Sequence, residues 1–279
     1  MTVAVLNWAI EKVEAGERVA IASVIRASGS VPGKPGARLA ISSSGEKFGT
    51  IGGAGLELTV EKELQEILSR DLSDLRKKGG KVEEFLLNRD GKGKEASALD
   101  SLCGGRVTVA MEVINPLPHI LIAGGGHVGL SISWVCDSLE WSYSVFDIRE
   151  EYCNQKRYPN AEATFCSSVE DFLKSESEDS LARFSDILLL SHDWSVDEEM
   201  LVGLLQLCRT GSRPRIGAIG SKKKWSAFEK KAVESGVEKW LIDSVRCPIG
   251  LDIGADTPEE IAIAVCAEVL SLERKNRAT

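Results

Sequence analysis

The feature that most constrains this chain is a short apolar run followed by three closely spaced glycines. The run Ile120–Ala123 suits a strand that is buried on both faces of a sheet. Gly124, Gly126 and Gly129 then follow in G-x-G-x-x-G spacing. In that pattern the first glycine permits a tight turn, the second lets the backbone approach a pyrophosphate, and the third lets a helix pack against the strand. A helix that begins here points free N–H groups and the positive end of its dipole at a phosphate.

A second predicted strand supplies the acid that such a turn requires. The segment Ser144–Ile148 contains Asp147, about twenty residues beyond the glycines, where an acid that binds a ribose hydroxyl belongs. Arg149 could bind a phosphate on that ribose, or it could be a solvated surface charge. His127 stands inside the turn, where it could face a ligand or cap the helix. The stretch predicts a nucleotide-type ligand, and the alternative is a vestigial, empty Rossmann turn.

The rest of the second half alternates strands and helices, which indicates a parallel sheet covered on both faces. Ligands of such sheets bind at the carboxyl ends of the strands. His192 and Asp193 follow a predicted strand at such an end, where they could orient a ligand or cap the next helix. Ser221 is a predicted helix cap, and the lysines after it could meet a phosphate. We expect strands at Ala163–Cys166, Asp186–Leu190, Arg215–Ile219 and Trp240–Ile242, and helices at Ser168–Lys174 and Asp197–Arg209.

The end of the chain combines a glycine- and proline-containing turn with a helix start. The composition of Cys247–Gly254 is too specific for a simple connector, and we expect this turn to lie across the mouth of the sheet. Thr257, Pro258 and Glu260 then match a capping box, with the threonine as N-cap and the proline at the first helical position. The predicted helix runs to about Arg274.

The boundary between two domains is marked by proline. Two prolines within Asn115–Pro118 stop both helix and sheet, so we place the boundary there. The predicted domains are residues 1–115 and a Rossmann-like nucleotide- or cofactor-binding domain at residues 116–279. In the first domain we expect helices at Val3–Glu14 and Leu58–Ser69, strands at Arg18–Ala27, Leu39–Ser42, Lys47–Thr50, Val82–Leu87 and Val107–Ile114, and a turn at Gly91–Ala96.

The first domain contains a second glycine-rich turn that opens a helix. Gly52 and Gly53 precede Glu57, which falls in the first helical turn. Such a turn is a second candidate for anion binding. Glu57 could contact a polar ligand, although an acid in the first turn is ordinarily a favourable partner of the helix dipole, and the sequence favours that structural interpretation.

One of the seven cysteines stands apart from the others. Cys103 lies just before two glycines in a predicted loop, a setting that could expose the thiol and aim backbone N–H groups at it. The alternative is a buried, inert cysteine. The number of cysteines is odd and none are in C-x-x-C spacing, so we expect thiols in a reducing compartment and read no zinc site from them.

Composition excludes several classes of function. The 279 residues are 43% hydrophobic and 27% charged, which predicts a folded, soluble protein of one or two domains. A net charge of −8 argues against nucleic acid as the main partner, since phosphate binding requires a basic face. No apolar run approaches the length of a membrane span, and the N-terminus lacks the order of a signal peptide. We therefore expect a cytoplasmic protein.

The order of these motifs resembles that of the XdhC/CoxI family, the xanthine dehydrogenase accessory proteins. Several motifs in the same order are more specific than any one of them, and the resemblance spans nearly the whole chain. The matching segments are Gly49–Glu57, Leu102–Gly105, Gly124–Gly129, Asp147–Arg149, Ser191–Asp193, Ile216–Ser221 and Pro248–Glu260.

The resemblance implies both a fold and a function. The fold class is α/β: a C-terminal Rossmann-like, doubly wound parallel sheet with an N-terminal α+β XdhC/CoxI domain. The implied function is a maturation factor that binds molybdenum cofactor (molybdopterin), holds it between the two domains while it is sulfurated, and delivers it to xanthine dehydrogenase or a related molybdenum hydroxylase. The apo hydroxylase, a cysteine desulfurase and a second copy of the chain are the implied partners.

The resemblance also assigns residues to the cofactor. The glycine turn would hold its phosphate, with Asp147 nearby, and Cys103 could contact the metal end as a soft ligand. The full set of predicted cofactor-binding residues is Gly124, Gly126, His127, Gly129, Asp147, Arg149, Gly52, Gly53, Glu57, Cys103 and His192, with Cys103 as the metal contact.

Two positions depart from the family pattern. Gly33 stands where family members often have an arginine, although Lys34 could replace that cation. Gly55 stands where a cysteine often precedes Leu-Glu, which removes a thiol from this turn and gives more weight to Cys103.

Two other functions remain open from the sequence. An NAD(P)-dependent oxidoreductase would use the glycine turn and Asp147 directly, but no catalytic donor pair is recognisable and His127 does not suit that turn. A nucleotide-sensing module with the first domain as its output is the third hypothesis. The sequence does not distinguish the mononucleotide from the dinucleotide form of the cofactor.

Overall fold

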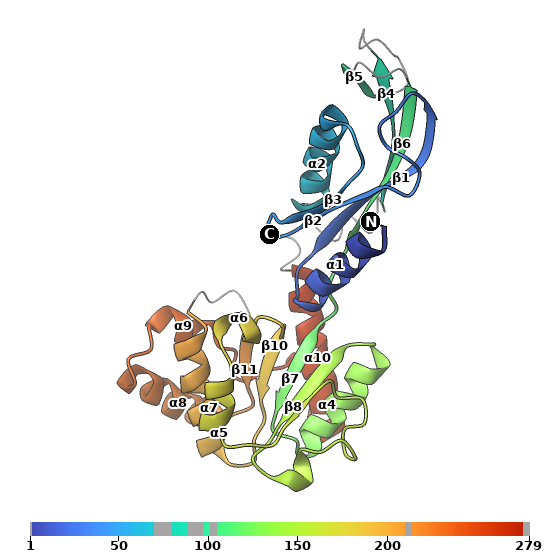
Figure 1. The fold of residues 1–279 in the computed structure, drawn as a ribbon. Coiled ribbons are helices and arrows are strands. Elements are labelled where there is room, and N and C mark those ends of the chain that lie inside the picture. Colours follow the sequence, from blue (N-terminus) through green and yellow to red (C-terminus); the bar gives the residue numbers. More distant parts are fainter. Residues whose placement is uncertain (1, 70–79, 89–96, 101–104, 210–213, 276–279) are drawn as a thin grey trace. The chain divides into compact units, whose positions relative to one another are not determined.

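The computed structural model describes residues 2–69, 80–88, 97–100, 105–209 and 214–275. The chain forms two compact units, one of Met1–Pro116 with Arg274–Thr279 and the other of Leu117–Glu273, and each is taken by itself below. Figure 1 gives the labels of the helices and strands.

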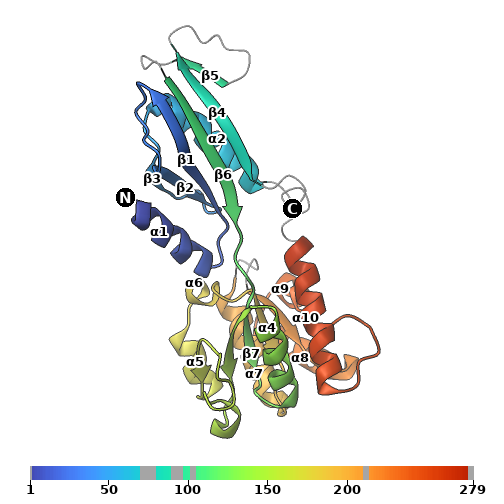
Figure 2. The ribbon, with the colours of Figure 1, turned by 90° about the vertical axis from the view of Figure 1, so that its right-hand side faces the viewer.

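Six strands form a single sheet in the first unit: β1 (Val19–Gly29), β2 (Arg38–Ser42), β3 (Lys47–Thr50), β4 (Lys81–Asn88), β5 (Ser97–Asp100) and β6 (Gly105–Ile114). Their order across the sheet is β3-β2-β1-β6-β4-β5. Neighbouring strands are antiparallel except for β4 and β5, which are parallel. The longest of them, β1, β6 and β4, run side by side (Figure 2).

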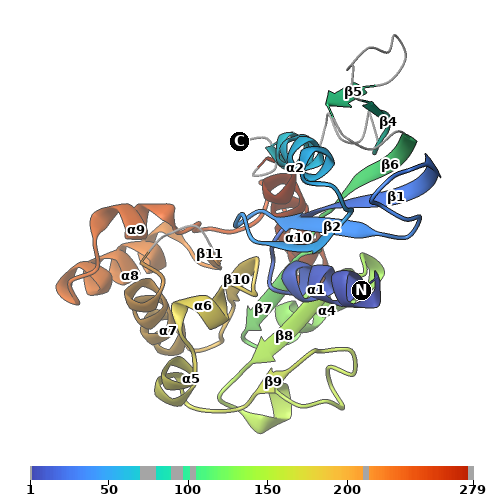
Figure 3. The same cartoon turned by 45° about the horizontal axis from the view of Figure 1, so that its top comes forward.

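Both faces of this sheet are covered by a helix. Because side chains alternate along a strand, Val19 and Ile21 of β1 pack on α1 (Thr2–Glu14), whereas Ala20 belongs to the larger cluster under α2 (Ala54–Ser69). Figure 3 shows the two helices on opposite sides of β1 and β2. The first half of β1 is therefore buried on both sides.

Five parallel strands form the sheet of the second unit: β7 (His119–Ala123), β8 (Ser142–Phe146), β9 (Thr164–Phe165), β10 (Asp186–Leu189) and β11 (Arg215–Ala218). Their order is β11-β10-β7-β8-β9. The chain thus adds strands outward from β7 on one side, then returns to add β10 and β11 on the other. The order reverses between β7 and β10, and ligands of open α/β sheets bind at such a switch point.

Helices cover both faces of this second sheet, as the sequence predicts for a doubly wound fold. They are α4 (His127–Ser138), α5 (Val169–Ser175), α6 (Glu178–Leu181), α7 (Trp194–Leu207), α8 (Lys222–Glu234), α9 (Lys239–Ser244) and α10 (Pro258–Lys275). Ile120 and Ile122 of β7 pack with α4 and α10, which lie side by side (Figures 1 and 2). Leu121 and Ala123 point the other way, toward α5, α7 and α8.

The sequence predicts the helix caps at Ser221 and Thr257 but leaves Asp193 open between a cap and a ligand contact, and α7 begins at Trp194 instead of the predicted Asp197. The side chains of Ser168, Asp193 and Ser221 accept hydrogen bonds from the first turns of α5, α7 and α8. The capping box at α10 is reciprocal: the Thr257 N–H donates to Glu260 Oε2 at 3.1 Å, and the Glu260 N–H donates to Thr257 Oγ1 at 3.3 Å. Local side-chain chemistry therefore fixes where these helices begin.

One predicted strand is wrong. Trp240–Ile242 lies within α9, not in a strand. A run of three apolar residues has no periodicity to distinguish a strand from a helical turn. Here Leu241 and Ile242 are buried while Trp240 is exposed. The position beside β11 is taken instead by Arg246, which forms a parallel bridge with Gly217.

The turn after Arg246 lies at the carboxyl end of β11. The Ile249 N–H donates to the Ala218 carbonyl at 3.2 Å, and the Leu251 N–H donates to the Ala264 carbonyl of α10 at 3.1 Å. The turn therefore links the last strand of the sheet to the last helix. Within the ranges given above, no helix is long and apolar enough to span a membrane.

A buried charged cluster joins β10, β11 and α10. Asp186 is fully buried and accepts hydrogen bonds from Arg215 and Arg246. Arg215 also donates to Glu273 at 2.6 Å, and Arg246 donates to Glu268 at 2.9 Å. Because a buried carboxylate needs partners to offset its desolvation, this cluster fixes how α10 packs on the sheet.

Candidate functional site

The three glycines of the G-x-G-x-x-G turn have different surroundings. Gly124 has a φ of +125°, and a Cβ there would lie 2.6 Å from the carbonyl carbon of Leu190. A Cβ on Gly129 would lie 2.3 Å from the Gly124 oxygen. A Cβ on Gly126 would meet nothing within 4 Å. The first and third glycines are thus required by backbone packing, while the middle one faces open space.

Helix α4 begins at this open position. Gly126 is its N-cap, and no side chain caps the helix. The first turn therefore keeps its N–H groups and dipole available to an anion. His127 is the first helical residue and is exposed, so it does not serve as the N-cap.

Asp147 follows β8 and is tied to the glycine turn. Its side chain is 3% exposed. Oδ2 accepts from the Gly125 N–H and from Arg149 Nη2, both at 2.9 Å, and Oδ1 accepts from the backbone N–H and Nε of Arg149. Burial alone would raise the pKa of this carboxyl, but the bonds from Arg149 and Gly125 outweigh it and hold the pKa below its usual value.

Arg149 is fixed by two contacts. Its guanidinium forms a two-point ion pair with Asp147 and lies 4.0 Å from the ring centre of Tyr152. The side chain is nevertheless 36% exposed. Its hydrogen bonds to Asp147 raise the pKa of Arg149 further, so it carries a positive charge at any physiological pH.

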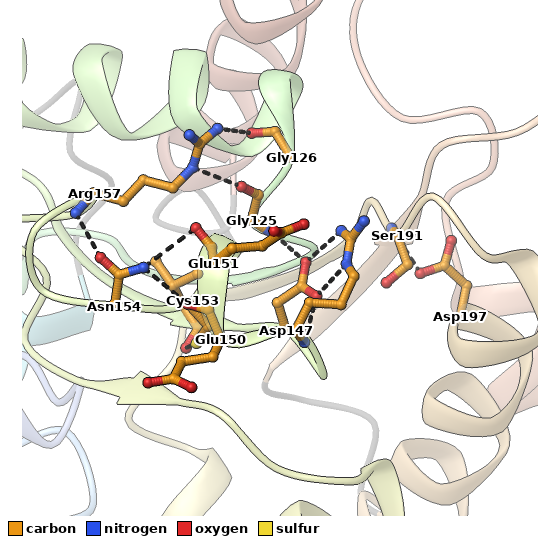
Figure 4. A network of polar contacts seen from close by, with 12 residues as sticks. Gly125, Gly126, Asp147, Glu150, Glu151, Cys153, Asn154, Arg157, Ser191 and Asp197 are labelled. Atoms are coloured by element: carbon orange, nitrogen blue, oxygen red, sulfur yellow. Dashed lines mark hydrogen bonds and ion pairs between the residues drawn. The ribbon is translucent and has the colours of Figure 1, made fainter.

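The carbonyl side of the glycine turn is held by the connection after β8 (Figure 4). Arg157 donates to the oxygens of Gly125 and Gly126 at 3.1 and 3.3 Å, as Figure 4 shows. The Tyr158 hydroxyl also donates to the Gly125 oxygen, at 2.8 Å. Burial raises the pKa of Tyr158 to about 12, so the phenol stays protonated as a donor. Sequence reasoning missed both residues, because no motif spacing marks them and their partners lie about thirty positions away.

A second arm of the site follows β10. The Ser191 N–H donates to Asp197 Oδ1 at 3.0 Å (Figure 4). Lys224 Nζ donates to Asp197 Oδ2 at 2.8 Å. Lys224 also donates to the Ile219 oxygen at 3.0 Å. Burial raises the pKa of Asp197 against the opposing effect of Lys224. Of the lysines after Ser221, Lys224 is thus bound within the protein. His192, which the sequence offered as a ligand contact, is exposed.

The glycine turn of the first unit is held by its own acid. Glu57 Oε1 accepts from the Gly52 N–H at 2.9 Å and from the Thr50 hydroxyl. A Cβ on Gly52, whose φ is +80°, would lie 2.9 Å from Pro32. The favoured interpretation of Glu57, a structural partner of the first helical turn, fits these bonds. A pocket of about 320 Å³ lies between this turn and the loop at residues 32–38.

The predicted site residues therefore fall into separate groups. Gly124, Gly126, Asp147 and Arg149 come together at the carboxyl ends of β7 and β8. Gly52, Gly53 and Glu57 come together in the first unit. Cys103, the predicted metal contact, lies outside the described residues, as does the turn predicted at 91–96. In the described part of the chain, no three His, Cys, Asp or Glu side chains gather as a metal site. Another pocket, of about 460 Å³ beside α5, α7 and α8, includes none of the predicted site residues.

Two of the known proteins that are similar to this chain are much longer than the region that matches it. Over 259 residues the chain is 29% identical to the uncharacterized protein YqeB of Escherichia coli (strain K12), covering 93% of this chain and 44% of that protein. Over 162 residues it is 26% identical to a probable xanthine dehydrogenase subunit of Bacillus subtilis (strain 168), covering 58% and 45%. The chain thus spans less than half the length of these two relatives.

A third relative is similar over nearly its whole length. The molybdenum cofactor insertion chaperone PaoD of Escherichia coli (strain K12) is 22% identical over 294 aligned residues, which cover 96% of this chain and 87% of PaoD. Two family models also match: the XdhC Rossmann domain over residues 120–269, and the XdhC and CoxI family over residues 13–77. The first model alone covers more than half of the chain. This chain therefore belongs to the XdhC and CoxI family, and its second unit contains an XdhC Rossmann domain.

Proposed function

We propose that this chain is a maturation factor that binds molybdenum cofactor, holds it for sulfuration and inserts it into a molybdenum hydroxylase of the xanthine dehydrogenase type. The observation that carries the proposal is the similarity to PaoD along nearly the full length of both chains. PaoD is named as a molybdenum cofactor insertion chaperone, and the similarity spans the Rossmann unit as well as the first unit.

The glycine turn of the second unit supports this proposal chemically. Molybdopterin carries a phosphate, or a pyrophosphate in its dinucleotide form. The open space at Gly126, the uncapped start of α4 and the cation of Arg149 together suit such a group. In this proposal the phosphate lies at the first turn of α4, and the pterin and metal extend away from it. The cofactor is cargo, so no residue of the chain needs to transform it.

The remaining parts of the proposal concern the metal end and the partners. Cys103 would contact the molybdenum or its sulfur as a soft ligand. The partners would be the apo hydroxylase and a cysteine desulfurase that supplies the sulfur, with a homodimer as the working form. The xanthine dehydrogenase name of the Bacillus subtilis relative supports this class of hydroxylase.

The test is a binding titration of the purified chain with molybdenum cofactor, followed by transfer to an apo hydroxylase. Cys103→Ala should weaken cofactor binding, and Cys166→Ala, which removes an exposed thiol elsewhere, should not. Hydroxylase activity should recover faster with the wild-type chain than with free cofactor. A chain that neither binds the cofactor nor accelerates recovery would contradict the proposal.

An NAD(P)-dependent oxidoreductase is the second candidate, because the strand order and glycine turn of the second unit are those of dinucleotide-binding sheets. The same titration separates the two candidates. Tight nicotinamide dinucleotide binding without uptake of the pterin would favour the oxidoreductase and direct the search toward its substrate.

A further inference from the structure

The carboxylate of Asp147 is fully occupied within the protein. An ionised carboxylate offers about four lone-pair sites on its two oxygens. Each oxygen of Asp147 already accepts two hydrogen bonds, three of the four from Arg149 and one from the Gly125 N–H. A ribose 2′-hydroxyl that donates to this acid would have to displace one of them. The arrangement therefore does not suit the ordinary role of this acid in dinucleotide binding.

Arg149 is held with one edge toward solvent. Nε and Nη2 are used on Asp147, and no described residue accepts a hydrogen bond from Nη1. The guanidinium is stacked on Tyr152, so its orientation is already set before a ligand arrives. Because little side-chain freedom remains to be lost, an anion can bind this edge at low entropic cost.

The exposed edge of Arg149 lies close to the glycine turn. Two successive hydrogen bonds of 2.9 Å, from Arg149 Nη2 to Asp147 Oδ2 and from the Gly125 N–H to the same oxygen, connect the two. The next residue, Gly126, faces open space at the start of α4. A ligand whose first phosphate lies on the helix could thus place a second anionic group on Arg149.

We propose that Arg149 is a specificity-determining residue that selects a ligand with a phosphomonoester over one with free ribose hydroxyls. The inference rests on the glycine turn being a ligand site, as in the proposed function. Two sources share this chemistry: the 2′-phosphate of a nicotinamide dinucleotide, whose pyrophosphate would lie on α4, and the single terminal phosphate of molybdopterin, which would lie between the first turn of α4 and Arg149. In either case the dianion takes the exposed edge of Arg149, and Asp147 fixes the guanidinium instead of binding the sugar.

Acidic neighbours of Arg149 limit how strongly it attracts a phosphate. Asp147 neutralises one unit of charge through the ion pair. Glu150 and Glu151 follow directly and are exposed, and Glu151 is close enough to contribute to the raised pKa of Arg149. Because Glu151 is in solvent, its side chain can turn away from a bound phosphate at small cost. Its negative charge still repels a phosphate on Arg149, so removing that charge should strengthen phosphate binding.

The test compares ligands that differ by one phosphate, on the full chain. NADPH and NADH are titrated by fluorescence, and molybdenum cofactor is titrated separately. Arg149→Gln removes the cation, and Lys156→Gln makes the same change of charge on an exposed residue of the same connection. The wild type should bind the phosphomonoester ligand, and Arg149→Gln should weaken that binding by about 10- to 100-fold. Lys156→Gln should change it by less than about threefold.

The two sources give different results. If the 2′-phosphate is bound, NADPH binds at least about tenfold more tightly than NADH, and Arg149→Gln abolishes the difference. If the pterin phosphate is bound, neither nicotinamide dinucleotide competes with molybdenum cofactor, and Arg149→Gln weakens only the binding of that cofactor. Should Arg149→Gln fold poorly, Arg149→Lys, which keeps the charge but loses the fork, should still lose part of the affinity, and Glu151→Gln should gain affinity.

Measurable binding of both NADPH and NADH with equal affinity would overturn the inference. Binding of molybdenum cofactor that is equally tight in the wild type and in the Arg149 and Glu151 variants would also overturn it. In that case the proposed function stands, and only the selection by Arg149 fails. If the wild type binds none of these ligands, both the inference and the proposed function fail.

Discussion

Two glycines of the same turn should respond in opposite ways to substitution. Gly129→Ala places a Cβ 2.3 Å from the Gly124 oxygen and 2.9 Å from Ile122 Cγ2. An ordinary carbon–oxygen contact is about 1 Å longer, and the obstructing atom is backbone that cannot rotate away. Helix α4 must therefore shift from β7. Gly126→Ser, by contrast, places its Cβ in open space, and serine is at least as good an N-cap as glycine.

The expected magnitudes differ in sign and in what they affect. Overpacking of this kind costs about 1–3 kcal/mol, and the better helix propensity of alanine returns at most about 1 kcal/mol. We therefore expect Gly129→Ala to lower the free energy of unfolding by about 1–2 kcal/mol, or the Tm of the second unit by about 2–8 °C. Gly126→Ser should leave the Tm unchanged or slightly raised, yet its side chain fills the space where a phosphate would lie.

Thermal unfolding followed by circular dichroism, together with a cofactor titration, distinguishes these effects. Gly126→Ser should keep its stability and lose at least about tenfold in affinity for a phosphate-bearing ligand. For Gly129→Ala the main effect should be a lower Tm. The reasoning is refuted if Gly129→Ala melts with the wild type, or if Gly126→Ser binds the ligand as tightly as the wild type does.

Three further predictions concern stability. Asp186→Asn should cost about 3–5 kcal/mol in urea unfolding, because Arg215 and Arg246, whose side chains are 13% and 16% exposed, would then face an amide. The exposed Asp243→Asn should cost under about 1 kcal/mol, and equal losses would contradict the role of the buried Asp186. Burial lowers the folded-state pKa of His119 from 6.5 to about 4, so the unfolded chain takes up a proton before the folded chain does as the pH falls. The free energy of unfolding should therefore fall between pH 6.5 and 4, by at most about 3 kcal/mol. His119→Gln should flatten this pH dependence, and an unchanged slope would exclude His119 as its cause. Glu57→Ala should destabilise the first unit by about 1–2 kcal/mol, because it removes the acceptor that the Gly52 N–H and the Thr50 hydroxyl share. Glu61→Ala, which removes an ion pair with a mostly exposed lysine, should change the free energy of unfolding by under about 1 kcal/mol, and similar values for both variants would contradict the structural role of Glu57.

Much of the second unit was predictable because its signals are local. The apolar run before Gly124 and the glycine spacing define β7, the turn and α4 without information from distant residues. Helix starts such as Thr257–Glu260 depend on side chains three positions apart, so the sequence contains both partners. The doubly wound sheet then follows from the alternation of strands and helices.

The partners of the candidate site were not predictable in the same way. The spacing identifies Asp147, but not that Arg149 and Gly125 fill its oxygens, because that depends on side-chain rotamers after folding. Tyr158 and Arg157 hold a turn about thirty residues earlier, and no periodicity records such a contact. Trp240–Ile242 was predicted wrongly because three apolar residues fit a helical turn as well as a strand.

The central claim is that the glycine turn of the second unit holds the phosphate of molybdenum cofactor. The most direct measurement is an equilibrium titration of the cofactor against the wild-type chain and Gly126→Ser, with equal thermal stability verified for both. The account predicts saturable binding by the wild type and a loss of at least about tenfold in Gly126→Ser. Saturable binding that is unchanged in Gly126→Ser would place the cofactor elsewhere in the chain, and the absence of binding by the wild type would contradict the proposed function itself.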